Sequence, residues 1–153
     1  MERLDPRVRF VWILGALLTA LVVGVVATGI VAVLTDLSLW VGVAVFVVVL
    51  VLGLVHALLR YRIWRFEVQE DALYLERGVL TRVRTVVPYV RIQHVDTQRG
   101  PVERVAGIGS VVVYTAGSRG ADVAIPGLDP DRATTVQHRL RSLVGESESE
   151  DAV

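Results

Sequence analysis

The sequence predicts a two-helix transmembrane hairpin followed by a mainly-β domain that a C-terminal α-helix caps. Two long runs without a charged residue indicate the hairpin, and alternating apolar and polar residues after residue 60 indicate the strands. An apolar stripe at helical spacing near the C-terminus indicates the capping helix. Of the 153 residues, 53% are hydrophobic, a share that excludes a disordered chain and is high for a soluble domain.

The first two elements are membrane spans over residues 10–34 and 37–59. Each run exceeds the roughly 20 apolar residues that cross a bilayer. The apolar core of a cleaved signal peptide is shorter, and the core helices of a soluble protein alternate apolar and polar faces, whereas these runs are apolar on all sides. We therefore expect an uncleaved hairpin, with Thr35, Asp36, Leu37 and Ser38 as a short connection.

Arginine placement predicts the orientation of this hairpin. Arginines lie just before the first run and just after the second, whereas the connection between the runs carries only Asp36. Because positive residues stay in the cytoplasm, we expect a multi-pass plasma-membrane protein with a cytoplasmic N-terminus over residues 1–9 and a cytoplasmic C-terminus. In this orientation Trp12 and Trp64 lie near the inner interface and Trp40 near the outer one, as in an aromatic belt.

Small residues recur at every fourth position of the first span. They are Ala16, Ala20, Gly24, Thr28 and Ala32. A smooth stripe of this kind lets another helix approach closely, either within the hairpin or from a second copy of the chain, although it also arises by chance in runs rich in Ala, Gly and Val. In the second span, His56 lies one turn before Arg60, where it can reach lipid headgroups.

Residues 60–145 predict a compact domain of short antiparallel strands. Alternating or β-branched segments bounded by turn residues predict strands over 61–69, 72–77, 80–87, 91–99, 111–115 and 121–125, with a short helix over 101–105. Asp129 and Pro130 begin an amphipathic helix that Gly145 ends, and we expect it to cap an open end of a curled sheet. The strongly acidic residues 146–153 predict a disordered tail.

An ordered series of short motifs runs through this predicted domain. It consists of Leu75–Gly78, Val87–Asp96, Arg99–Arg104, Gly107–Ser110 and Thr115–Gly117. With the preceding hairpin, this series resembles the YdbS-like membrane-flanked domain family. The resemblance implies a bacterial pleckstrin-homology-like (PH-like) domain, a β-sandwich or split barrel capped by the C-terminal helix. It also implies a larger membrane protein with several copies of this domain as a companion, a cell-envelope link in some members, and no assigned catalytic residue.

Few residues have the types and spacing that catalysis requires. The chain has no Cys, and its 16 basic residues are all Arg, which excludes thiol, disulfide and lysine Schiff-base chemistry. His94 and Asp96 share a face of a predicted strand and, with Glu103, offer metal-binding side chains, but the His-x-Asp spacing is not that of a recognised metal site. We therefore expect a non-enzymatic protein with no catalytic residue, metal or cofactor.

The candidate binding residues of the domain are Arg82, Arg84, Arg91, His94 and Asp96. A guanidinium binds phosphate through two parallel hydrogen bonds, and the domain carries more Arg than acidic residues. Such a domain can rest on an anionic inner leaflet, although the same arginines are also compatible with an ordinary strand surface. The charge is not clustered enough for nucleic acid binding, and no groove-reading motif is present.

Two functions follow from these observations. The first is a membrane protein that presents a PH-like interaction domain at the cytoplasmic face and assembles with a related multi-copy membrane protein or with further copies of itself. The alternative is recognition of an anionic lipid headgroup or a phosphate at the inner leaflet.

Overall fold

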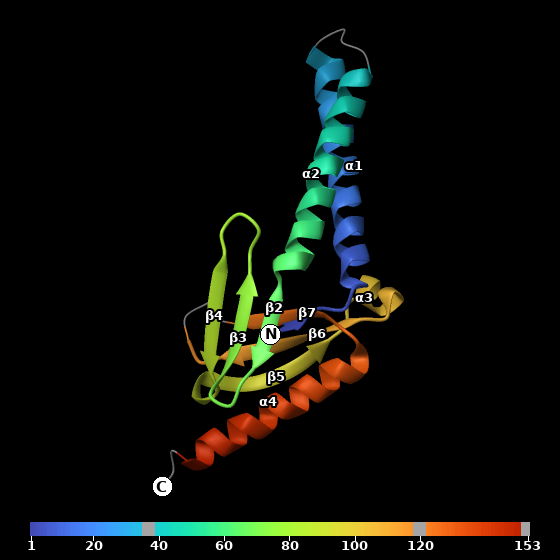
Figure 1. Cartoon of the computed structure of the whole chain (residues 1–153). Helices are drawn as coiled ribbons and strands as arrows, with labels where there is room; N and C mark the ends of the chain where they lie inside the picture. The colour runs from blue at the N-terminus through green and yellow to red at the C-terminus, as the bar shows by residue number, and fades with distance from the viewer. Residues whose placement is uncertain (35–38, 118–121, 151–153) are drawn as a thin grey trace. The chain divides into compact units, whose positions relative to one another are not determined.

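The structure is a computed structural model that describes residues 1–34, 39–117 and 122–150. The chain forms two compact units (Figure 1): residues Arg9–Arg62 make one, and Met1–Val8 together with Ile63–Val153 make the other. The first unit holds the helices α1 (Val8–Leu34) and α2 (Trp40–Ile63). Both are long and apolar enough to cross a membrane, which confirms the predicted hairpin. The predicted connection over residues 35–38 lies outside the described residues.

The second span extends further than its uncharged run predicts. The helix α2 continues through Arg60 and Arg62 to Ile63, so the strand predicted over residues 61–69 is shorter than expected. Arginine is a good helix former whose long side chain can keep its charge at the membrane surface, so the helix need not end with the apolar run. Only residues Arg65–Val68 form the strand β2.

Sheet A contains four antiparallel strands in the order β1-β2-β3-β4. They are β1 (Glu2–Arg3), β2 (Arg65–Val68), β3 (Ala72–Arg77) and β4 (Val83–Pro88). The strand β1 precedes the first span in the sequence, and its Glu2 lies opposite Phe66 of β2. The chain then carries Leu4 and Val8 into the core of the β domain, where each is only 2% exposed. The domain is therefore assembled from residues on both sides of the hairpin.

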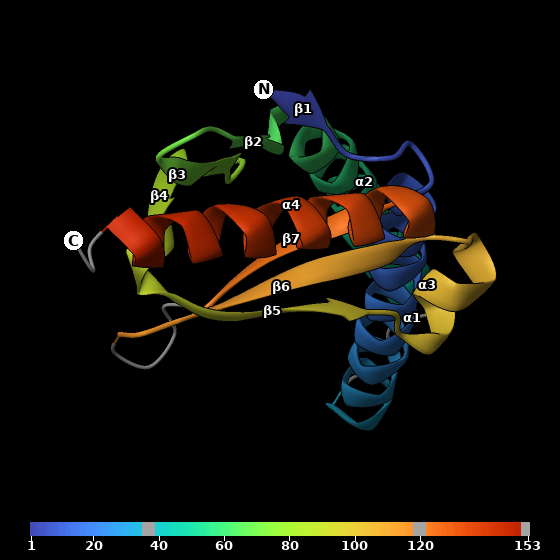
Figure 2. The same cartoon turned by 90° about the horizontal axis from the view of Figure 1, so that it is seen from below.

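Sheet B contains three antiparallel strands, and a long helix covers it. The strands are β5 (Ile92–Gln98), β6 (Gly109–Thr115) and β7 (Val123–Leu128), with the 3-10 helix η1 (Tyr89–Arg91) before β5 and the short helix α3 (Pro101–Ala106) after it. The helix α4 (Pro130–Glu150) lies along β5 and β6 (Figure 2). Two small antiparallel sheets and a capping helix confirm the predicted PH-like architecture.

Large apolar side chains of both sheets and of α4 fill the core of this domain. Fully buried members include Phe66, Leu73, Leu75, Ile108, Val111, Ile125, Leu128 and Leu140. Trp64, directly after α2, is also buried, so its ring does not face lipid as an aromatic belt would require. Trp64 directly precedes β2, and its two-residue spacing from Phe66 places both side chains on the inward face.

Two element boundaries differ from the predicted ones. The strand β4 begins at Val83 rather than at Leu80, because residues 78–82 form the turn after β3. Gly78 adopts a φ of +98°, and an added Cβ would lie 2.0 Å from the carbonyl oxygen of Thr81, so only glycine fits there. The last strand, β7, begins at Val123 and continues through Leu128, and residues 118–121 before it lie outside the described residues.

The helix α4 does not end at Gly145 as predicted but runs to Glu150. A glycine inside a helix costs about 1 kcal/mol relative to alanine, which a long helix tolerates. The hydroxyl of Ser147 donates to the carbonyl oxygen of Val144 at 2.8 Å, one turn back. The segment predicted as a disordered tail is thus helical up to residue 150, and residues 151–153 lie outside the described residues.

Candidate functional site

Two of the candidate arginines lie together around one carboxylate of sheet A. Arg82 in the β3–β4 turn and Arg84 on β4 approach the Oε1 atom of Glu76 at 3.9 and 3.7 Å. The Arg82 and Arg84 side chains are 71% and 77% exposed, whereas that of Glu76 is only 13% exposed. One carboxylate cannot neutralise two guanidinium groups, so this corner of the domain stays positive and accessible.

Arg91 does not join this cluster. The register of β3 and β4 pairs Ala72 with Pro88 and Arg77 with Val83, so η1 and the β3–β4 turn lie at opposite ends of sheet A. Arg91 instead lines a separate cavity of about 280 Å³ between the end of β4 and the end of β6, together with Pro88 and Thr115. The three arginines that the sequence grouped therefore form two sites rather than one.

His94 and Asp96 share one exposed face of β5. The Nε2 atom of His94 lies 3.8 Å from the Oδ2 atom of Asp96, and the imidazole stacks on Tyr114 of β6 with ring centroids 4.2 Å apart. Glu103 is engaged elsewhere, because its carboxylate accepts the backbone N–H of Gly100 at 2.8 Å and caps α3. Within the described ranges no group of three metal-ligating side chains forms, so these residues make a polar sheet surface.

The outer edge of β4 is open, whereas α4 contacts the β5 edge of sheet B. Gln137 and Arg141 of α4 donate to the carbonyl oxygen of Val95 at 2.8 and 3.1 Å and thereby cover β5. In the described part of the chain, no strand pairs with the outer side of β4. Val83 and Val86 on this strand are exposed, so an unpaired backbone lies beside apolar side chains.

The small stripe of α1 faces α2 within the hairpin. A Cβ added to Gly24 would lie 2.9 Å from the Cβ of Phe46. A Cβ added to Gly42 would lie 2.9 Å from the Cβ of Thr28, and one added to Gly53 would lie 2.8 Å from the Cβ of Ala16. Ala20 between these positions is fully buried, whereas Ala32 at the end of the stripe is exposed. The helix backbones approach closely because both helices carry small residues along this line.

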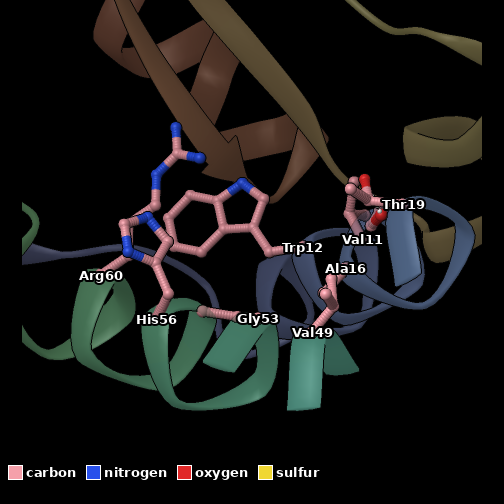
Figure 3. A pocket seen from close by; sticks show the side chains of 10 residues that line it. Val11, Trp12, Ala16, Thr19, Val49, Gly53, His56 and Arg60 are labelled. Atoms are coloured by element: carbon pink, nitrogen blue, oxygen red, sulfur yellow. Dashed lines mark hydrogen bonds between the residues drawn. The ribbon is translucent and has the colours of Figure 1, made fainter. Parts of the chain in front are cut away.

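A cavity of about 390 Å³ opens between α1 and α2, at the end of the hairpin that holds Arg60. Its lining is mostly small or apolar, with Gly15 and Ala16 from α1 and Gly53 and Ala57 from α2. Figure 3 shows His56 and Arg60 extending from α2 toward the indole ring of Trp12 on α1.

Two cation–π contacts join the helices near this cavity. The guanidinium carbon of Arg60 lies 4.2 Å from the ring centroid of Trp12, and that of Arg9 lies 4.9 Å from the ring centroid of Tyr61. The sequence pointed to His56 and Arg60 as interfacial residues. It did not indicate that Trp12 and the small residues around it form a common cavity with them.

The comparisons with known proteins agree with this architecture. Residues 9–144 match the bacterial PH domain family, a range that includes the hairpin and most of the β domain. The UPF0699 transmembrane protein YdbS of Bacillus subtilis (strain 168) is 32% identical over 84 residues, which are 55% of this chain and 51% of that protein. The chain thus spans about half the length of this curated relative. No solved structure matches it significantly. With nearly its whole length covered by one family, and with the predicted resemblance confirmed, the chain belongs to the bacterial PH domain family.

Proposed function

We propose that the chain is a non-enzymatic integral membrane protein that presents its PH domain at the cytoplasmic face and binds a related membrane protein there. The open edge of β4 is the single observation that carries this proposal. A partner strand placed along this edge pairs with the free backbone groups, and the exposed Val83 and Val86 add apolar contacts. Arg82 and Arg84 on the same edge favour a partner segment with acidic residues.

The topology rests on how the β domain is built. Because β1 precedes the first span and β2 follows the second, their pairing supports a hairpin with both ends on one side of the membrane. The arginines at both ends favour the cytoplasmic side. Because the sequence contains no cysteine, a cysteine introduced at the exposed Val105 is the only thiol in the chain and the only site of labelling. A membrane-impermeant maleimide should label V105C only after the cells are permeabilised, and labelling of intact cells would refute the orientation.

Site-specific photo-crosslinking tests the partner surface. A photoreactive amino acid at Val86, on the edge of β4, should form an adduct with a membrane protein that carries a PH domain. The same amino acid at Val105, on the surface of α3, should not. Val86→Lys should abolish recovery of this partner from mild detergent, because a lysine on an edge strand blocks strand addition, whereas Val105→Lys should leave it unchanged. Equal adducts at both positions, or no protein adduct at Val86, would contradict the proposal.

One observation favours anionic lipid as a second ligand of this domain. Leu80 at the tip of the β3–β4 turn is 97% exposed, and Arg82 and Arg84 follow it directly. The register pairs Arg65 with Glu76, so this turn lies at the end of sheet A where the chain arrives from α2, which ends at Ile63. An exposed leucine beside two arginines suits an anionic membrane surface, which accepts both apolar and cationic groups.

An environment-sensitive fluorophore on L80C, in the full chain reconstituted in nanodiscs, tests this second function. Its emission should shift to the blue in nanodiscs that contain phosphatidylglycerol and not in pure phosphatidylcholine, because each arginine gains about 1 kcal/mol near an anionic surface. High salt should reverse the shift. The same label on V105C is the control. An L80C emission that is the same in nanodiscs with and without phosphatidylglycerol would exclude this function.

A further inference from the structure

We propose that the hairpin itself binds one anionic phospholipid, with an acyl chain in the cavity between α1 and α2 and the phosphate on Arg60. This site is distinct from the PH domain surfaces discussed above, and it requires only that the hairpin lies in a membrane. Three features support it: the volume and lining of the cavity, the placement of its charged end, and the lack of an acidic side chain near that charge in the described part of the hairpin.

The cavity has the volume and the lining that part of a hydrocarbon chain requires. It measures about 390 Å³ and owes its space to the small residues Gly15, Ala16, Gly53 and Ala57 on the facing helices. The hydroxyl of Thr19, which also lines it, donates to the carbonyl oxygen of Gly15 at 2.8 Å and so needs no further partner. The inner part of the cavity is therefore apolar, and in a bilayer an acyl chain is the species available to fill it.

A cationic group closes one end of the cavity. Arg60 lies over the indole of Trp12 at 4.2 Å, and His56 lies one helical turn before it on the same face of α2 (Figure 3). Stacking occupies one flat face of the guanidinium and fixes its plane, which leaves N–H groups at its edge for two oxygens of a phosphate. Basic pockets between transmembrane helices bind the headgroups of anionic lipids in the same way.

No acidic side chain competes for this arginine within the hairpin. Between Asp5 and Glu67 the only acidic residue in the sequence is Asp36, which precedes Arg60 by 24 positions. Among the described residues, no carboxylate lies within ion-pair distance of Arg60. The charge at the mouth of the cavity must therefore be balanced from outside the hairpin, and the anion present at that depth is a lipid phosphate.

Native mass spectrometry of the full chain in detergent tests the proposal with two probe lipids. Phosphatidylglycerol and phosphatidylcholine of identical acyl chains should be compared, and the protein should retain one phosphatidylglycerol with at least a tenfold preference. Arg60→Gln should remove this preference while keeping hydrogen-bonding groups, and Arg60→Lys should restore part of it. Arg62→Gln is the matched control, because it removes a charge from the same end of α2 without lining the cavity.

The acyl-chain half of the site has its own pair of variants. A Cβ added at Gly15 meets no atom within 4 Å, and Gly15 lines the cavity, so we expect the side chain of Gly15→Leu to occupy part of the cavity. It should lower phosphatidylglycerol retention about tenfold, whereas Gly29→Leu, at an equally open position away from the cavity, should not. Equal retention of the two lipids, unsaturable binding of many lipids, or loss in the control variants as well would overturn the proposal.

Discussion

Truncation of Leu4 to alanine tests whether the residues ahead of the first span belong to the core of the β domain. Leu4 is 2% exposed, next to the strand β1 that pairs with β2. Leu80 is 97% exposed at the tip of the β3–β4 turn, so Leu80→Ala is a chemically identical change without burial. The two variants therefore differ only in what surrounds the side chain that is removed.

The expected difference is large because a buried leucine loses both its transfer free energy and its packing. Leu→Ala in a core costs about 2–5 kcal/mol, whereas an exposed position changes stability by about 0.5 kcal/mol or less. For a domain of this size, 1 kcal/mol shifts the unfolding temperature by roughly 4–8 °C. Leu4→Ala should therefore lower the unfolding temperature of the β domain by about 8 °C or more, and Leu80→Ala should leave it nearly unchanged.

Fluorescence of the buried Trp64 reports on unfolding of this domain in the detergent-solubilised full chain. The other two tryptophans, Trp12 and Trp40, lie in the hairpin and are replaced by phenylalanine in every variant of this experiment. Equal unfolding temperatures for Leu4→Ala and Leu80→Ala would show that residues 1–8 do not pack in the core. That result would refute the topology argument as well.

Two further predictions concern the hairpin and the pH dependence of the β domain. Gly24→Ala places a Cβ 2.9 Å from the Cβ of Phe46, whereas Gly29→Ala meets nothing within 4 Å. Gly24→Ala should therefore cost about 1–3 kcal/mol of stability in detergent relative to Gly29→Ala. Circular dichroism should show this as a lower thermal midpoint for Gly24→Ala, and equal midpoints would contradict close helix packing. Burial raises the pKa of Tyr89, whose hydroxyl donates to the carbonyl oxygen of Gln69, to about 12. Since an unfolded tyrosine ionises near pH 10, this contribution to stability is complete below about pH 10 and is lost as the pH rises to about 12. The urea midpoint of the wild-type chain should fall across this window more steeply than that of Tyr89→Phe, and parallel curves would contradict the assignment.

Local signals in the sequence were sufficient for much of the fold. Length and the absence of charge identify a span without knowledge of its neighbours, so both helices of the hairpin could be predicted. The short helix α3 was equally accessible, because Pro101 begins it and Gly107 ends it in a left-handed conformation with a φ of 71°. The strand β3 matches its predicted range for the same reason, since turn residues bound it on both sides.

Features that depend on distant pairing could not be predicted in this way. The strand β1 has two residues, too few for a periodicity, and its partner lies beyond two membrane spans. The available signal for burial of this segment was the presence of the apolar Leu4 and Val8 among charged residues. Their four-residue spacing is typical of a helix, so it gave no indication of a strand.

The candidate binding residues show the same limit. Arg82, Arg84 and Arg91 are neighbours in sequence, yet an extended strand and the turn of η1 separate the last from the first two. The spacing of His94 and Asp96 did predict their common face, because the two-residue period of a strand is a local property. The cavity beside Trp12 required the relative placement of two helices, which no single segment encodes.

The pairing of β1 with β2 has a consequence for biogenesis. A ribosome releases residues 1–8 long before residues 63–150, so the early segment must wait unpartnered until both helices have been inserted and the later strands have been synthesised. A chain that inserts only one helix leaves the two parts of the domain in different compartments, with Leu4 and Val8 missing from the core. Correct double insertion is thus a precondition for a folded domain, and a misinserted chain is exposed to quality-control proteases.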